Sequence, residues 1–171
     1  MKKIVFLINE FGYGGVENQI VSLAESLVDL YKIEIVCLKK VIKENINKKI
    51  SVREIDIKDT FLSIGYDKKL VKCLNSFIGD YDIIVVNDNV FNNVIDKLNI
   101  SDKQVYYWLH NKIIESKNKL SKYDNVILPN KYLNYDLRLD NAIVIPNIIN
   151  QDIFAYKKKE PELRKNIFMA R

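Results

Sequence analysis

The chain has 171 residues, of which 48% are hydrophobic, enough for the core of one globular domain. Its formal net charge is +5, but the lysines are scattered, which argues against nucleic-acid binding and leaves a solvated surface or contact with an anionic membrane. The two cysteines, Cys37 and Cys73, form no CxxC pair and are expected to be buried free thiols.

Strands and helices alternate along most of the chain. The segments with the pattern of strands are 3–8, 33–38, 51–57, 82–86, 104–109, 125–128 and 142–145. The segments with helical spacing of apolar residues are 16–31, 67–78, 90–98, 112–120 and 131–137, the last capped by Asn130. Residues 39–50 predict a loop or a short helix. This alternation predicts an α/β fold with an open, mostly parallel, Rossmann-like sheet and helices on both faces.

A glycine-rich loop joins the first predicted strand to the first predicted helix. Gly14 and Gly15 stand just before Glu17 in the first helical turn. Helix N-termini attract anions, because their first N–H groups lack partners and the helix dipole is positive there. The glycines therefore serve either a tight turn alone or a close approach of the backbone to a phosphate or sugar. Their spacing differs from the GxGxxG fingerprint, and no P-loop Gly-Lys-Ser/Thr occurs.

Polar residues follow two further predicted strands. Asn87 and Asp88 follow residues 82–86, a run that is apolar on both faces and therefore typical of a central parallel strand. His110 and Asn111 end the strand over 104–109. Ligands of open α/β sheets bind outside the carboxyl ends of the strands, so these residues and the glycine loop are expected to gather there.

His110 is the only histidine. Its role is either structural or that of a neutral imidazole that hydrogen-bonds a hydroxyl or carbonyl group of a ligand. The preceding run Tyr106-Tyr107-Trp108 favours sheet packing over a base-stacking platform. No metal-ligand spacing, paired-carboxylate signature or Ser/His/Asp order stands out, so no metal is expected.

The strand–helix pattern fails near the end of the chain. Residues 1–155 form the predicted domain, and residues 156–165, with Lys157-Lys158-Lys159-Glu160-Pro161, predict a solvated linker. Residues 166–171 again have the pattern of a strand. A lone strand after a linker favours the start of a second domain, most of which we expect to be missing.

Taken in order, these motifs resemble the N-terminal domain of a GT-B glycosyltransferase of family 4, a group of retaining enzymes that use nucleotide sugars. The matching segments are Gly14-Gly15-Val16-Glu17, Asp82-Ile83-Ile84-Val85-Val86, Trp108-Leu109-His110-Asn111, Ile127-Leu128-Pro129-Asn130, Ile145-Pro146-Asn147-Ile148-Ile149-Asn150 with Phe154, and Ile167-Phe168-Met169-Ala170-Arg171. The departures are Ile148 and Ala170, where the family has glycine, and Asn150, where it has aspartate. They affect the turn between domains more than the cleft.

The resemblance implies two Rossmann-like domains that face each other across a cleft. Residues 1–155 would be the acceptor-side domain, and a C-terminal donor-binding domain, in cis or as a partner, would be missing. The co-substrate would be a nucleoside-diphosphate sugar, whose sugar contacts His110. The implied donor or substrate contacts are Gly14, Gly15, Glu17, Asn87, Asp88, Asn111 and Asn130. The resemblance implies no other cofactor.

The expected function is thus the acceptor-binding half of a retaining glycosyltransferase. It would act on a sugar or lipid-linked acceptor in bacterial-type surface glycan or glycolipid synthesis, and the chain alone would be inactive. One alternative is a non-catalytic acceptor-binding or membrane-docking subunit that pairs with a separate donor-binding protein. A small nucleotide-binding or flavodoxin-like domain is the other, although no phosphate fingerprint supports it.

The expected location is the cytoplasm, with peripheral contact at the inner membrane face. No apolar segment approaches the roughly 20 residues of a spanning helix. The apolar run after Lys2 and Lys3 is short and is broken by Asn9 and Glu10, unlike a secretory signal.

Overall fold

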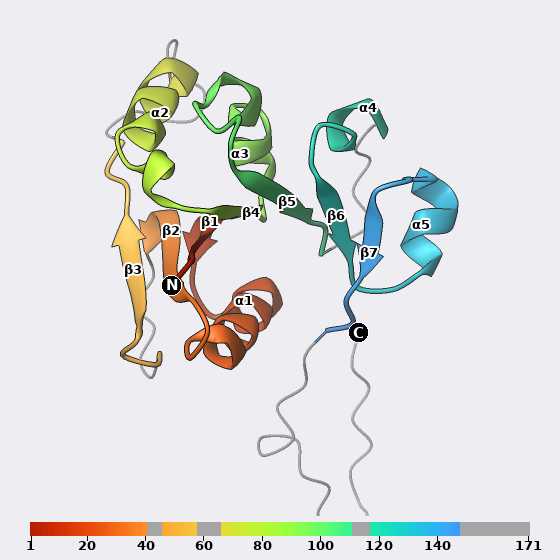
Figure 1. The fold of residues 1–171 in the computed structure, drawn as a ribbon, viewed down its shortest axis with the longest axis horizontal. Helices are drawn as coiled ribbons and strands as arrows, with labels where there is room; N and C mark the ends of the chain where they lie inside the picture. The colour runs from red at the N-terminus through yellow and green to blue at the C-terminus, as the bar shows by residue number, and fades with distance from the viewer. Residues whose placement is uncertain (41–45, 58–65, 111–116, 148–171) are drawn as a thin grey trace, which may run out of the picture.

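The computed structural model describes residues 1–40, 46–57, 66–110 and 117–147. These residues form one seven-stranded sheet in which every paired strand is parallel to its neighbour (Figure 1). Its strands are β1 (Lys3–Phe11), β2 (Lys32–Lys40), β3 (Ile50–Glu54), β4 (Ile83–Val86), β5 (Gln104–Trp108), β6 (Asn125–Leu128) and β7 (Ala142–Val144). The helices are α1 (Gly15–Leu27), α2 (Tyr66–Asn75), α3 (Asn89–Asn92), α4 (Lys117–Leu120) and α5 (Tyr132–Leu137), with short 3-10 helices η1 (Ile78–Asp80) and η2 (Ile95–Lys97).

In the strand order β3-β2-β1-β4-β5-β6-β7, the side of the sheet on which the chain adds new strands changes once. The chain adds β2 and β3 on one side of β1, and then returns to place β4 on the other side. The carboxyl ends of β1 and β4 therefore lie side by side at a topological switch point, where open α/β sheets bind their ligands.

The two faces of the sheet bury different apolar sets. Along β1, Val5 and Leu7 face a core shared with α2 and α3, whereas Ile4, Phe6 and Ile8 face a core shared with α1. Figure 1 shows α2 and α3 on one side of the sheet and α1 on the other. The predicted fold class, an open parallel Rossmann-like sheet with helices on both faces, is confirmed.

Two predicted boundaries were wrong near the first strand. β1 continues past Ile8 because Glu10 and Phe11 still pair with β2, and Phe11 is fully buried. α1 ends four residues before the predicted position 31, since the amides of Leu30 and Tyr31 both bond the carbonyl oxygen of Leu27 and turn the chain.

The helix predicted over 90–98 was also wrong, because α3 and η2 take its place. The Nζ of Lys122 donates to the carbonyl oxygen of Asn92 at 2.7 Å, so this oxygen has a side-chain donor. The amide of Val94 then bonds the carbonyl oxygen of Phe91, three residues earlier, at 3.1 Å, so the α-helical hydrogen-bond pattern does not continue. A lysine from a distant segment thus supports a break that local spacing does not reveal.

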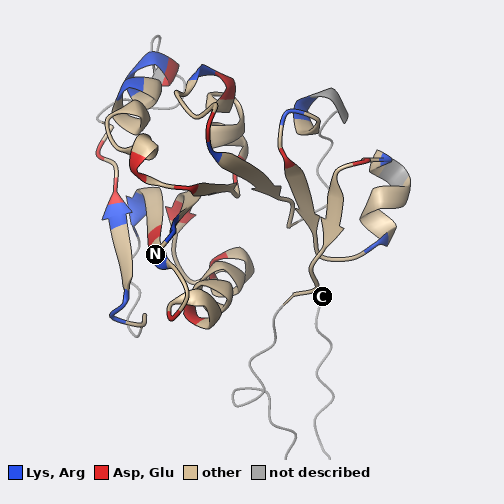
Figure 2. Cartoon of the chain, in the orientation of Figure 1, with Lys and Arg blue, Asp and Glu red and all other residues tan. Residues whose placement is uncertain are grey.

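Both cysteines are free thiols; Cys37 is buried, whereas Cys73 is half-buried. In the described part of the chain, no helix has the length and apolar character to cross a bilayer. Lysines and arginines lie on α2, on β3 and at both ends of α5, interspersed with acidic residues (Figure 2). The predicted linker over 156–165 and strand over 166–171 lie outside the described residues.

Candidate functional site

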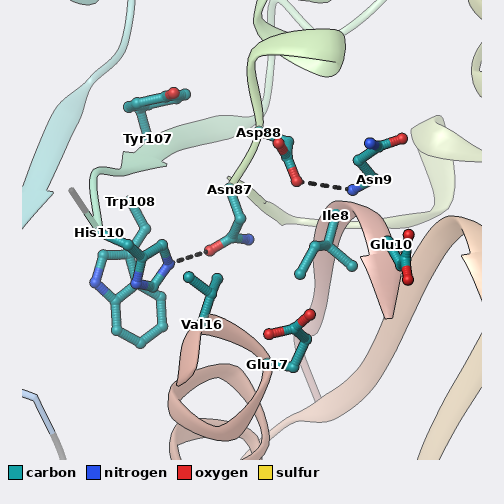
Figure 3. A pocket seen from close by; sticks show the side chains of 10 residues that line it. All are labelled: Ile8, Asn9, Glu10, Val16, Glu17, Asn87, Asp88, Tyr107, Trp108 and His110. Atoms are coloured by element: carbon teal, nitrogen blue, oxygen red, sulfur yellow. Dashed lines mark hydrogen bonds between the residues drawn. The ribbon is translucent and has the colours of Figure 1, made fainter. Parts of the chain in front are cut away.

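A cavity of about 240 Å³ opens at the carboxyl ends of β1, β4 and β5, beside the first turn of α1 (Figure 3). Its lining residues are Ile8, Asn9, Glu10, Val16, Glu17, Asn87, Asp88, Tyr107, Trp108 and His110. Four residues predicted from the sequence, Glu17, Asn87, Asp88 and His110, are thus brought together, although they come from separate segments.

Two of these residues, His110 and Asn87, form one wall of the cavity and are joined by a hydrogen bond. The Nε2 atom of His110 lies 3.1 Å from the Oδ1 atom of Asn87. Asn87 is buried, and its Nδ2 donates to the backbone oxygens of Val85 at 3.1 Å and Leu7 at 3.3 Å. Asn87 therefore links the ends of β4 and β1 to the residue that follows β5.

The imidazole of His110 is held in a largely desolvated position. Its ring lies against that of Trp108, with 4.6 Å between the ring centroids. Burial disfavours the charged form and lowers the pKa of His110 to about 4. The folded chain therefore carries a neutral imidazole at neutral pH.

Carboxylates line the opposite wall. Asp88 Oδ2 accepts a hydrogen bond of 2.9 Å from the backbone N–H of Asn9, which ties the segment after β4 to the end of β1. Burial is the main cause that raises the pKa of Asp88; this hydrogen bond opposes the increase, and the charge of Glu17 adds to it. Glu10 pairs with Lys39 at 3.1 Å. The cavity contains no lysine or arginine among its described lining residues.

Gly14 and Gly15 differ in their surroundings. Gly14 is the N-cap of α1, and a Cβ there would collide with the carboxylate of Glu17, which lies against it. Gly15 has open space around its Cα. With Val16, Gln19, His110 and Asn147, it lines a second cavity of about 340 Å³. Val16 and His110 are shared by both cavities.

The other predicted contacts have different outcomes. Asn130 caps α5, since its Oδ1 accepts from the backbone N–H groups of Tyr132 at 3.0 Å and Leu133 at 3.2 Å. It is absent from the described lining of both cavities. Asn111 lies outside the described residues. Its predicted role, like the implied role of Gly14, stays a prediction.

Several lining residues were missed from the sequence. Asn9 and Glu10 were placed beyond the first strand, whereas they belong to it. Trp108 was expected to pack in the sheet, and it does, but its ring also covers His110. The alternation of side chains along β5 was a usable signal for Trp108, because residues two apart in a strand lie on the same side and Trp108 is two residues before His110. The buried Nε1 of Trp108 has no hydrogen-bond partner within the described ranges.

Metal binding finds no support in the part of the chain that the structure describes. These residues contain no group of three or more histidine, cysteine, aspartate or glutamate side chains that could hold a metal ion. The chemistry available at the cavity is hydrogen bonding by a neutral imidazole, an amide and carboxylates. Such groups suit a ligand that carries several hydroxyl groups.

Solved structures with the same fold include glycosyltransferases. The HepE protein of Anabaena in complex with UDP and glucose has a TM-score of 0.64 at 19% identity; the match covers 95% of this chain and 48% of HepE. A second HepE structure is in complex with UDP-glucose. A glycosyltransferase from Rickettsia africae has a TM-score of 0.62 at 16% identity, with 94% of this chain and 47% of that one covered.

Sucrose-phosphate synthase from Thermosynechococcus elongatus has a TM-score of 0.59 at 14% identity, with 85% of this chain and 48% of the synthase covered. No family model and no curated protein sequence matches the chain. Likeness at these identities establishes a shared fold. The chain spans about half the length of these three proteins, and its fold is that of one half of a GT-B glycosyltransferase.

Proposed function

We propose that the chain is the acceptor-side half of a nucleotide-sugar-dependent, retaining glycosyltransferase of family 4 type. The observation that carries this proposal is the His110–Asn87 pair, at the switch-point cavity of a fold shared with glycosyltransferases. One of these was solved with UDP-glucose. The proposal assigns the donor-binding half to a second domain, in cis or as a partner protein, since the chain spans about half of its structural neighbours.

The charges around the two cavities support different ligands for each cavity. The cavity with Glu10, Glu17 and Asp88 disfavours phosphate and suits hydroxyl groups, whose protons carboxylates accept. The cavity beside Gly15 has no carboxylate among its described lining residues and adjoins the N-terminus of α1. We therefore place the sugar diphosphate on the Gly15 side and the acceptor on the carboxylate side, with His110 between them.

This arrangement also supports a mechanism. Negative charge develops on the leaving diphosphate during sugar transfer, and N–H groups fixed at a helix N-terminus stabilise such charge without having to reorganise. His110, neutral and shared by both cavities, contacts a hydroxyl of the transferred sugar. The acceptor is proposed to be a sugar or lipid-linked sugar of a surface glycan or glycolipid.

The test measures binding and transfer together. With the donor-binding half supplied, calorimetry with UDP-glucose should show binding that His110→Ala weakens at least about tenfold, or about 1.4 kcal/mol, whereas Lys68→Ala, at an exposed position of α2, leaves it unchanged. Transfer of labelled glucose from UDP-glucose to glycolipid acceptors should be absent with the 171 residues alone and present when a donor-binding half is supplied. Equal binding by the native chain and His110→Ala, or transfer by the chain alone, would contradict the proposal.

A further inference from the structure

We propose that Asn87 is a positioning residue: it fixes His110 as the neutral tautomer with the proton on Nε2, and so reserves Nδ1 as an acceptor for a ligand hydroxyl. The identification of that hydroxyl with a sugar rests on the proposed function. The tautomer itself does not, because it follows from hydrogen bonds within the ligand-free chain.

Two backbone carbonyl oxygens determine the orientation of the Asn87 amide. One end of this amide lies 3.1 Å from the carbonyl oxygen of Val85 and 3.3 Å from that of Leu7. Carbonyl oxygens only accept hydrogen bonds, so the end that faces them must be the NH₂ group, which can donate to both. The amide oxygen Oδ1 therefore faces His110.

The orientation of the Asn87 amide in turn determines which ring nitrogen of His110 carries the proton. The amide oxygen of Asn87 has no proton, and it lies 3.1 Å from Nε2 of His110. A hydrogen bond between these atoms requires the proton on Nε2. Because the backbone of two strands orients the amide and the amide orients the proton, the tautomer is fixed by the sheet itself.

The surroundings of the ring determine its charge. His110 is packed against Trp108, and its desolvation favours the neutral form. The charged side chains facing the same cavity are Glu10, Glu17 and Asp88, and Nε2 bonds the amide of Asn87 instead of any of these carboxylates. A neutral ring with its proton on Nε2 keeps an unshared electron pair on Nδ1.

The consequence is a selective contact. Nδ1 has no hydrogen-bond partner in the described part of the chain. As an acceptor, it binds a hydroxyl or another N–H or O–H donor, and it repels the oxygens of carbonyl and ionised phosphate groups. Of the two partners that suit a neutral imidazole, a hydroxyl and a carbonyl, Asn87 thus selects the hydroxyl.

The experiment uses the fact that the chain has a single histidine. The NMR shifts of its two ring nitrogens, read between about pH 6 and 8, should show a protonated Nε2 and a lone-pair Nδ1 in the native chain. Asn87→Ala should give a mixture of both tautomers. Asn92→Ala removes another buried asparagine, whose Oδ1 accepts from Tyr123, and should leave the His110 spectrum unchanged.

A protonated Nδ1 or a tautomer mixture in the native chain would overturn the proposal, even if Asn87→Ala fails to fold. An unchanged tautomer in a folded Asn87→Ala chain would overturn it as well. UDP-glucose should then move the Nδ1 resonance in the direction of hydrogen-bond acceptance, whereas UDP alone should not. With the donor-binding half supplied, binding of UDP-glucose without this change refutes the hydroxyl contact. An absence of binding under the same condition refutes the proposed function, while the spectrum of the chain alone still reports the tautomer.

Discussion

Two polar clusters lie at opposite ends of the sheet, beside cavities of similar size. The candidate site occupies the carboxyl end, with a cavity of about 240 Å³. The amino end has a cavity of about 230 Å³, where Glu34 of β2 meets Arg53 of β3 and Tyr81, which precedes β4. Cavity size therefore does not distinguish a ligand site from a structural cluster in this chain.

The partners of each group do distinguish them. At the amino end, the carboxylate of Glu34 accepts hydrogen bonds from Nε of Arg53 at 2.7 Å, from Nη2 of Arg53 at 3.4 Å and from the hydroxyl of Tyr81. The hydrogen bond to Glu34 is the main cause that raises the pKa of Arg53. Burial, followed by Glu34, raises the pKa of Tyr81.

At the carboxyl end, burial alone lowers the pKa of His110, and burial is the main cause that raises the pKa of Asp88. At the amino end, Glu34, Arg53 and Tyr81 bond one another, whereas His110 bonds a neutral amide and Asp88 accepts from a backbone N–H. Groups in a cavity whose pKa values are shifted are candidates for ligand contact. The difference teaches that the kind of partner each group has is a better guide to function here than cavity size.

The largest expected effect is a loss of stability in acid that depends on His110. The unfolded chain takes up its proton near pH 6.5, whereas the folded chain does so only near pH 4. The lowered pKa therefore leaves the free energy of unfolding unchanged above about pH 6.5 and reduces it as the pH falls towards 4, by about 3 kcal/mol.

Urea unfolding of the native chain and of His110→Gln should show this loss as a difference between the two pH profiles. The raised pKa of Asp88 acts in the opposite direction, since protonated Asp88 favours the folded chain, but it contributes to both profiles. Parallel profiles would mean that the imidazole is not desolvated in the folded chain.

The next largest effect is a loss of stability when the cluster at the amino end of the sheet is disrupted. Tyr81 is 5% exposed as a residue, and Glu34→Ala leaves its hydroxyl without its acceptor, so this variant should lower the free energy of unfolding by about 2 kcal/mol. Glu34→Gln keeps an acceptor and should lose about half as much. Neither variant should change UDP-glucose binding in calorimetry; weaker binding would make this cluster part of the site.

A third prediction concerns Asn130. Asn130→Ala should lower the free energy of unfolding by about 1 kcal/mol through the loss of the α5 cap. Asn130→Ser keeps a capping oxygen and should restore most of it. If Asn130→Ala instead weakens UDP-glucose binding at unchanged stability, the ligand contact implied by the resemblance is correct.

The smallest effect is expected at the glycine loop, where one substitution should raise stability and weaken ligand binding. Gly15→Ala places a methyl group in open space within the first turn of α1 and should raise the free energy of unfolding by about 0.5 kcal/mol. The same methyl group faces the second cavity and should weaken UDP-glucose binding. Stronger folding with unchanged affinity would exclude Gly15 from contact with the diphosphate.

The sequence was sufficient for the fold class and for the gathering of residues at the strand ends. Alternation predicted the parallel sheet, and the rule for carboxyl ends brought Asn87, Asp88 and His110 together. Local patterns also predicted the cap at Asn130, because an asparagine cap acts within three residues.

Contacts between distant residues account for what the sequence did not show. The extension of β1 to Phe11 depends on pairing with Lys40, and the break after α3 involves Lys122. The hydrogen bond between Asn87 and His110 joins residues 23 apart, and the direction of its proton follows from backbone atoms of two strands. Periodicity carries no information on such pairings.

The contact between Trp108 and His110 has a practical consequence. The chain contains one tryptophan and one histidine, and their rings lie together at the cavity. An imidazolium accepts an electron from an excited indole more readily than a neutral imidazole does, so the intrinsic fluorescence of the chain should report on this one place. Titration with acid or with a sugar nucleotide can then be followed without a label, by tryptophan emission excited at a wavelength that the 10 tyrosines do not absorb.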